Sequence, residues 1–131
     1  MIEIMLELRP IGELFKSERY SDALVELELL WQKVPNPKEA TLNSYLIVSY
    51  GVTIALKIRS LDEAWSWALR GLTYSGNFNL AGESEFLLGE VAFARSDYET
   101  AKSYFKTVEK MSGWRLFKNK NPKYRQLIEI L

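Results

Sequence analysis

The sequence predicts an all-α fold built from a stack of helical hairpins. The first observation is a short pattern in which a bulky apolar residue stands three places before an alanine, with acidic residues beside them. This pattern occurs three times, at 19–23, 60–64 and 97–101. The second observation is that each copy ends one stretch of helical apolar periodicity and begins another. Such repetition is typical of helical arrays rather than of compact enzymes.

The composition is that of an ordinary globular protein, and we expect one domain spanning residues 1–131. Apolar residues make up 47% of the chain, which is enough to form a core. Charged residues make up 26%, as in ordinary folded proteins. The 17 basic and 17 acidic residues give a formal net charge of zero. Cysteine and histidine are both absent, which removes thiolate ligands, cysteine nucleophiles and the commonest general base. We therefore expect no metal site, no cofactor and no catalysis.

The sequence does not predict export or contact with a membrane. Residues 1–7 are acidic and lack the basic start and apolar run of a signal peptide. The longest uncharged stretch, 40–56, is too short to span a bilayer and contains several polar residues. The absence of cysteine fits a reducing compartment. We expect a cytoplasmic protein.

The first two helices follow from one proline and from the apolar spacing. Pro10 either opens a short helix that ends near Ser17 or kinks a longer helix that begins near Glu3. The second helix is expected from Tyr20 to about Lys33, because its apolar residues recur at helical spacing on one face.

Prolines and small polar residues mark the boundaries of the next two helices. The Pro-Asn-Pro segment at 35–37 ends the second helix, and its last proline is expected to open a third helix that runs to about Ile58. Ser60 and Glu63 have the spacing of a capping box. They predict the start of a fourth helix that ends near Tyr74.

The last three helices are expected at about 78–94, 97–112 and 121–131. A Ser-Gly-Asn break precedes the first of them. Ser96 and Glu99 have the spacing of a second capping box and predict the start of the next. An Asn-Pro pair is expected to open the terminal helix. The sequence shows no convincing strand pattern.

The third copy of the pattern resembles a tetratricopeptide (TPR) repeat. In that family, small residues let the two helices of a hairpin pack closely, and a large apolar residue one turn later fills the gap. Gly89 and Ala101 match the small positions, and Phe105 matches the large one. The second copy departs from the family, because Ala68 stands where a large residue is usual. The copies are also spaced more widely than the family period of about 34 residues.

The resemblance implies a right-handed stack of three TPR-like hairpins, roughly 3–34, 37–75 and 78–113, with a capping helix at 121–131. It also implies a non-catalytic module that binds a protein partner and sequesters, neutralises or chaperones it. A bacterial toxin immunity protein and a small secretion chaperone are two examples of this class. The competing class is a nucleic-acid or ribonucleoprotein-binding protein.

In TPR-like arrays the first helix of each hairpin lines a concave face, which defines the first candidate surface. In the third hairpin this suggests Phe86, Glu90 and Phe93, whose spacing places them on one helical face. The corresponding residues of the second hairpin are Ser49, Thr53, Leu56 and Lys57. Such a groove suits a helix or peptide partner. The alternative is that the two phenylalanines belong to the core and the glutamate is solvated.

The second candidate surface is the basic end of the chain. Between residues 102 and 125 a single acid, Glu109, opposes eight basic residues, and aromatic residues are interleaved with the later charges. Lys102, Lys106 and Lys110 form a row spaced by four. This surface suits an acidic protein or a nucleic acid, and the alternative is a solvated helix face. The zero net charge and the lack of a nucleic-acid-binding motif favour the protein.

Overall fold

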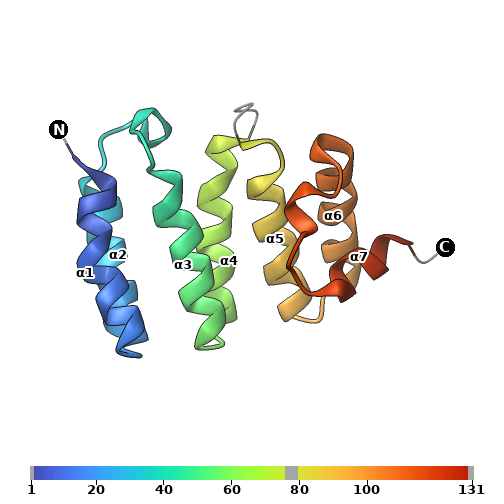
Figure 1. Cartoon of the computed structure of the whole chain (residues 1–131), viewed down its shortest axis with the longest axis horizontal. Coiled ribbons are helices and arrows are strands. Elements are labelled where there is room, and N and C mark those ends of the chain that lie inside the picture. Colours follow the sequence, from blue (N-terminus) through green and yellow to red (C-terminus); the bar gives the residue numbers. More distant parts are fainter. Residues whose placement is uncertain (1, 76–79, 130–131) are drawn as a thin grey trace. The chain divides into compact units, whose positions relative to one another are not determined.

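The computed structural model describes residues 2–75 and 80–129, and every regular element within them is a helix (Figure 1). This confirms the predicted all-α class. The contacts of the chain divide it into two compact units, residues 1–67 and 68–131. Within the described ranges, no helix combines the length and the apolar character needed to cross a bilayer.

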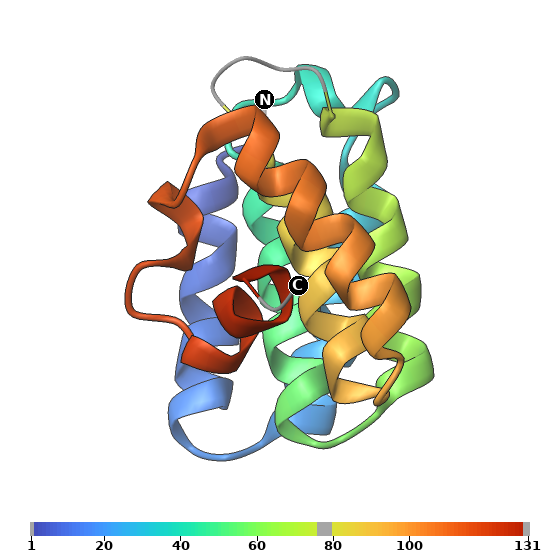
Figure 2. The same cartoon turned by 90° about the vertical axis from the view of Figure 1, so that its right-hand side faces the viewer.

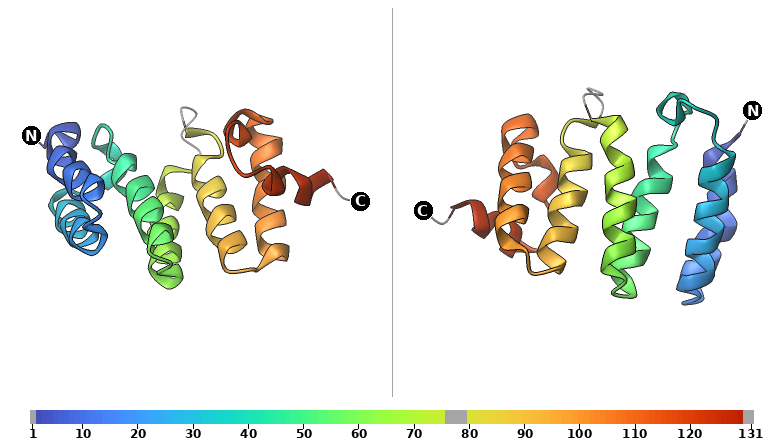
Figure 3. Two further views of the ribbon diagram at one scale, coloured as in Figure 1. Left: turned by 60° about the horizontal axis from the view of Figure 1, so that its bottom comes forward. Right: turned by 180° about the vertical axis from the view of Figure 1, so that it is seen from behind.

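The first unit begins with a helical hairpin. Its elements are α1 (Ile4–Lys16), α2 (Tyr20–Lys33), the 3₁₀ helix η1 (Lys38–Ala40), α3 (Tyr45–Lys57) and the start of α4 (Leu61–Arg70). In Figure 1 and Figure 3, α1 and α2 run side by side in opposite directions. α3 packs against α2. The amphipathic faces of these helices meet to form the core of the unit.

Helix bounds in the first unit follow the predictions except at one place. α2 has the expected bounds, and Pro10 lies inside α1, so the longer of the two alternatives is confirmed. The prediction that a helix begins at Pro37 and runs on to α3 is wrong, because only η1 forms there. The buried Ser44 donates its hydroxyl to the carbonyl of Lys38 at 2.8 Å, and Asn43 adopts a positive φ of 67°. These local bonds favour a turn over a continuous helix.

A tryptophan packs against a glycine in the first unit. Trp67 is 2% exposed, and its indole ring occupies the place where a Cβ of Gly51 would stand. The same ring meets Trp31 edge-on, with 6.3 Å between the ring centroids. The bulky side chain that packs against α3 here is thus Trp67, and its neighbour Ala68 is fully buried.

The second unit contains the end of α4 and a second helical hairpin. The elements that follow α4 are η2 (Gly71–Tyr74), α5 (Glu83–Ala94), α6 (Tyr98–Ser112), the 3₁₀ helix η4 (Arg115–Phe117) and α7 (Pro122–Glu129). α5 and α6 pack against each other as antiparallel helices, and α7 packs beside them against α6 (Figure 2). The predicted end of the terminal helix, at 130–131, lies outside the described residues.

Two predicted helix starts in the second unit need correction. The expected start near Phe78 lies outside the described residues, and α5 begins only after Gly82, whose φ of +93° is readily adopted by glycine. The N-cap of α6 is Asp97 rather than Ser96. The Asp97 carboxylate accepts a hydrogen bond from the backbone N–H of Thr100 at 3.2 Å, whereas Ser96 has a φ of +62°. The capping box predicted for Ser96 is therefore wrong.

Candidate binding surfaces

A pocket of about 350 Å³ lies between α1 and α3 in the first unit. Its lining comes from Ile11, Gly12, Phe15 and Lys16 of α1 and from Ser49, Tyr50, Thr53 and Ile54 of α3. Ser49 and Thr53 are two of the four residues expected to face a partner on this helix, and the structure brings them together here. The other two, Leu56 and Lys57, do not line the pocket. Leu56 is half-buried and Lys57 is exposed.

The local chemistry makes the walls of this pocket mainly apolar. Gly12 has no side chain, and the space where its Cβ would stand holds no atom within 4 Å. Phe15 is half-buried and rests edge-on against Tyr20, whereas Tyr50 is 39% exposed. Thr53 donates its hydroxyl to the backbone carbonyl of the residue four places earlier, at 3.0 Å. Because that bond satisfies the hydroxyl hydrogen within the helix, the pocket mainly offers van der Waals contact.

The α1 wall of this pocket was not among the residues proposed from the sequence. Gly12 and Phe15 lie three apart and so share a face of α1, which is the only signal that the sequence offers. The pocket exists because α1 and α3, separated by α2 in the chain, lie beside each other within the first unit. Helical periodicity identifies a face but not its neighbour.

The predicted partner face of α5 is covered by α7. The ring centroid of Tyr124, on α7, lies 5.9 Å from that of Phe86 and 5.0 Å from that of Phe93. It also lies 4.8 Å from the ring centroid of Phe105 on α6. Phe86 is only 4% exposed and belongs to the core of the second unit. The structure thus brings the predicted residues together, and the chain's own terminal helix packs on them.

Glu90 is the acidic group within this aromatic cluster. Burial raises the pKa of the Glu90 carboxyl, and the Lys120 ammonium and a hydrogen bond from the Tyr124 hydroxyl partly oppose that rise. The pKa of Tyr124 is raised as well, first by burial and then by the nearby carboxylate. Lys120 places its Nζ 5.8 Å from the ring centroid of Phe86. Glu90 therefore connects α5 to the C-terminal segment through charge as well as through packing.

The basic row lies on α6, as its spacing predicts. Lys106 and Lys110 are exposed and Lys102 is half-buried. None of the three forms an ion pair with another residue in the described part of the chain. The row alone therefore has the features of a solvated helix face.

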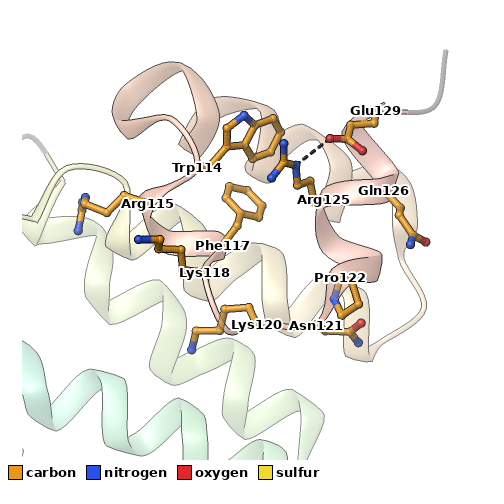
Figure 4. A pocket seen from close by; sticks show the side chains of 10 residues that line it. All are labelled: Trp114, Arg115, Phe117, Lys118, Lys120, Asn121, Pro122, Arg125, Gln126 and Glu129. Atoms are coloured by element: carbon orange, nitrogen blue, oxygen red, sulfur yellow. Dashed lines mark hydrogen bonds and ion pairs between the residues drawn. The ribbon is translucent and has the colours of Figure 1, made fainter.

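A second pocket, of about 620 Å³, lies within residues 114–129 (Figure 4). Its lining consists of Trp114, Arg115, Phe117, Lys118, Lys120, Asn121, Pro122, Arg125, Gln126 and Glu129. The sequence indicates that basic and aromatic residues alternate here but not that they enclose a pocket. The pocket forms because the chain leaves α6 at Gly113, with a φ of +64°, and returns to begin α7.

Comparison with protein-family models, curated proteins and solved structures gives no match for this chain. We therefore infer a function from the structure itself, chiefly from the α1–α3 pocket, the pocket at 114–129 and the α7-covered face of α5. In residues 2–75 and 80–129, acidic side chains form no group of three or more arranged to hold a metal ion.

Proposed function

We propose that this protein is a non-catalytic binding module that sequesters, neutralises or chaperones one protein partner. The observation that carries the proposal is the pocket between α1 and α3. There Ser49 and Thr53, expected to face a partner, stand beside Phe15 and Tyr50. A concave and mainly apolar pocket of this volume suits one large side chain projected from a partner helix.

The packing of α7 supports a helical ligand. α7 has no buried residue among those described, yet it lies on the α5–α6 hairpin through one aromatic side chain, Tyr124. A short helix with a single aromatic anchor is therefore compatible with a helical-hairpin surface of this chain. A partner helix that presents one aromatic or large aliphatic residue would use the α1–α3 pocket in the same manner.

The resemblance to TPR repeats supports the same class of function, because such arrays hold partners on the first helices of their hairpins. A cytoplasmic toxin immunity protein and a small secretion chaperone are two forms that the proposal can take. Both require a stable complex. Because apolar contact is not screened by ions, the complex is expected to survive moderate salt.

Affinity capture with a matched pair of variants tests this proposal. Thr53→Lys places a charge at the rim of the α1–α3 pocket. Thr107→Lys is the control, because both threonines are exposed and each donates its hydroxyl to the carbonyl four residues earlier. We expect wild type and Thr107→Lys to retain the same protein at moderate and high salt, and Thr53→Lys to lose it while keeping its helicity. Equal retention by the two variants would count against the pocket.

The basic residues between 102 and 125 favour the competing function, nucleic-acid binding. That function predicts retained material that is sensitive to nuclease and that is lost steeply as salt rises, because phosphate contacts release counterions. Charge reversal at Lys106 and Lys110 would then abolish retention, whereas Thr53→Lys would leave it unchanged. The same capture experiment therefore separates the two functions.

A further inference from the structure

The aromatic wall of the pocket at 114–129 is anchored in the core of the second unit. Trp114 and Phe117 meet edge-on, with 5.1 Å between their ring centroids. Phe117 in turn lies 5.1 Å from the ring centroid of Phe86 and 5.6 Å from that of Phe105. Because Phe117 is buried, this wall has a fixed position.

The two arginines of the pocket are already held by carboxylates. Arg125 lies 4.1 Å from the ring centroid of Trp114 and donates from Nε to Glu129 at 2.7 Å (Figure 4). Arg115 donates to both carboxylate oxygens of Glu83 at 3.2 Å. These bonds orient the guanidinium groups and neutralise much of their charge. The arginines therefore shape the pocket more than they attract a further anion.

The remaining positive charge comes from Lys118 and Lys120. Both are exposed, and neither forms an ion pair with a described residue. The Lys120 ammonium also interacts electrostatically with the Glu90 carboxylate. The pocket lining contains four basic residues and one acidic residue, so it carries a net positive charge beside its aromatic wall.

We propose that this pocket binds an acidic peptide segment of the protein partner. Its carboxylates pair with Lys118 and Lys120, and an apolar side chain between them packs against the wall of Trp114, Phe117 and Pro122. This inference rests on the proposed protein-binding function and adds the chemistry of the partner. Opposite charge attracts such a segment, and the aromatic contact supplies the specificity that charge alone lacks.

The carboxylates around the pocket favour an acidic peptide over nucleic acid. Glu129 lines the pocket, and Glu83 lies next to Arg115, so carboxylates repel a continuous phosphate backbone at both arginines. A peptide can place its few carboxylates at the two lysines alone.

Fluorescence anisotropy with the purified full chain tests the inference. The probe is a short labelled peptide in which aspartates and glutamates flank a central Leu-Phe pair. A second peptide carries Asn and Gln in place of the acids, and a short oligothymidine represents nucleic acid. We expect only the acidic peptide to bind appreciably. Combined Lys118→Gln and Lys120→Gln substitutions should weaken its binding roughly tenfold, as expected for two exposed charge pairs.

Combined Lys102→Gln and Lys106→Gln substitutions are the control, because they remove the same charge from residues outside the pocket lining. We expect this pair to change the affinity by less than about twofold. Equal weakening by both pairs, tighter binding of the oligonucleotide, or no binding of the acidic peptide would overturn the inference. If the peptide assay fails in one of these ways but Thr53→Lys still abolishes capture of the partner, only the pocket at 114–129 is rejected. If Thr53→Lys captures the partner as well as wild type does, the α1–α3 pocket is rejected, independently of the peptide result.

Discussion

The ring of Phe105 fills the space that Gly89 leaves between α5 and α6. A Cβ at position 89 would lie 2.5 Å from Cε1 of that ring, and Phe105 is fully buried. Gly89→Ala must therefore displace a core side chain. We expect it to lower the free energy of unfolding by about 1–2 kcal/mol, even though alanine favours the helix. Chemical denaturation followed by circular dichroism measures the change.

Gly12→Ala is the matched control, because this glycine is also helical but has no atom within 4 Å of its missing Cβ. Here only the helix preference of alanine acts. We expect the free energy of unfolding to rise by as much as about 1 kcal/mol. The test is that the free energy of unfolding changes in opposite directions for the two substitutions. If both substitutions raised it, the packing described for Phe105 would be contradicted.

The resemblance to TPR repeats implied that Gly89 is a small position and that Phe105 fills the gap in the same hairpin, and the two residues do meet. In the second hairpin the resemblance only marked Ala68 as a departure, and it did not point to Trp67, which packs against Gly51. The sequence also predicted a helix over residues 38–44, where side-chain bonds to the backbone favour a turn. Apolar periodicity predicts where helices form, but it does not reveal where side-chain hydrogen bonds to the backbone interrupt them.

The candidate sites were predictable only in part. Ser49 and Thr53 lie on a predicted face and do line a pocket. The covering of Phe86 by α7 and the pocket at 114–129 both depend on how the chain turns after Gly113. A single glycine does not encode the direction of that turn, so these long-range contacts required the structure.

The raised pKa of Glu90 predicts how the free energy of unfolding depends on pH. Because its pKa is raised in the folded protein, the folded state binds this proton more tightly than the unfolded chain does. The contribution of Glu90 to stability therefore falls as pH rises from its ordinary pKa of 4.5 through the raised folded pKa. Glu90→Gln removes this titration. We expect a higher thermal midpoint than wild type at neutral pH and a vanishing difference in acid, and a lower midpoint at neutral pH would refute the assignment.

Tyr124 is expected to hold α7 mainly through its ring. Tyr124→Ala removes contacts with Phe86, Phe93 and Phe105, and we expect a loss of about 2–3 kcal/mol in the free energy of unfolding, since the ring is half-buried. Tyr124→Phe removes only the hydroxyl that faces Glu90 and should cost about 1 kcal/mol or less. Denaturation and limited proteolysis of the segment before α7 distinguish the variants. Equal losses would mean that the hydroxyl, rather than the ring, holds the helix.

The N-cap of α6 gives a further test, because the sequence pointed to Ser96 and the structure to Asp97. Asp97→Ala removes the acceptor for the Thr100 N–H and should cost about 1 kcal/mol. Ser96→Ala is the control and should change stability by less than about 0.5 kcal/mol. Thermal melts of the two variants are sufficient, and a larger loss for Ser96→Ala would restore the capping box.

The most direct test of the proposed function is a site-specific photo-crosslink in the source cell. A photoreactive phenylalanine analogue replaces Tyr50, which lines the α1–α3 pocket and is 39% exposed, or Tyr98, which lies on α6 and is 49% exposed. We predict that position 50 becomes covalently joined to one protein and that position 98 does not. Crosslinks from position 98 alone, or from neither position while nucleic acid is retained on the basic segment, would contradict a partner held in the α1–α3 pocket.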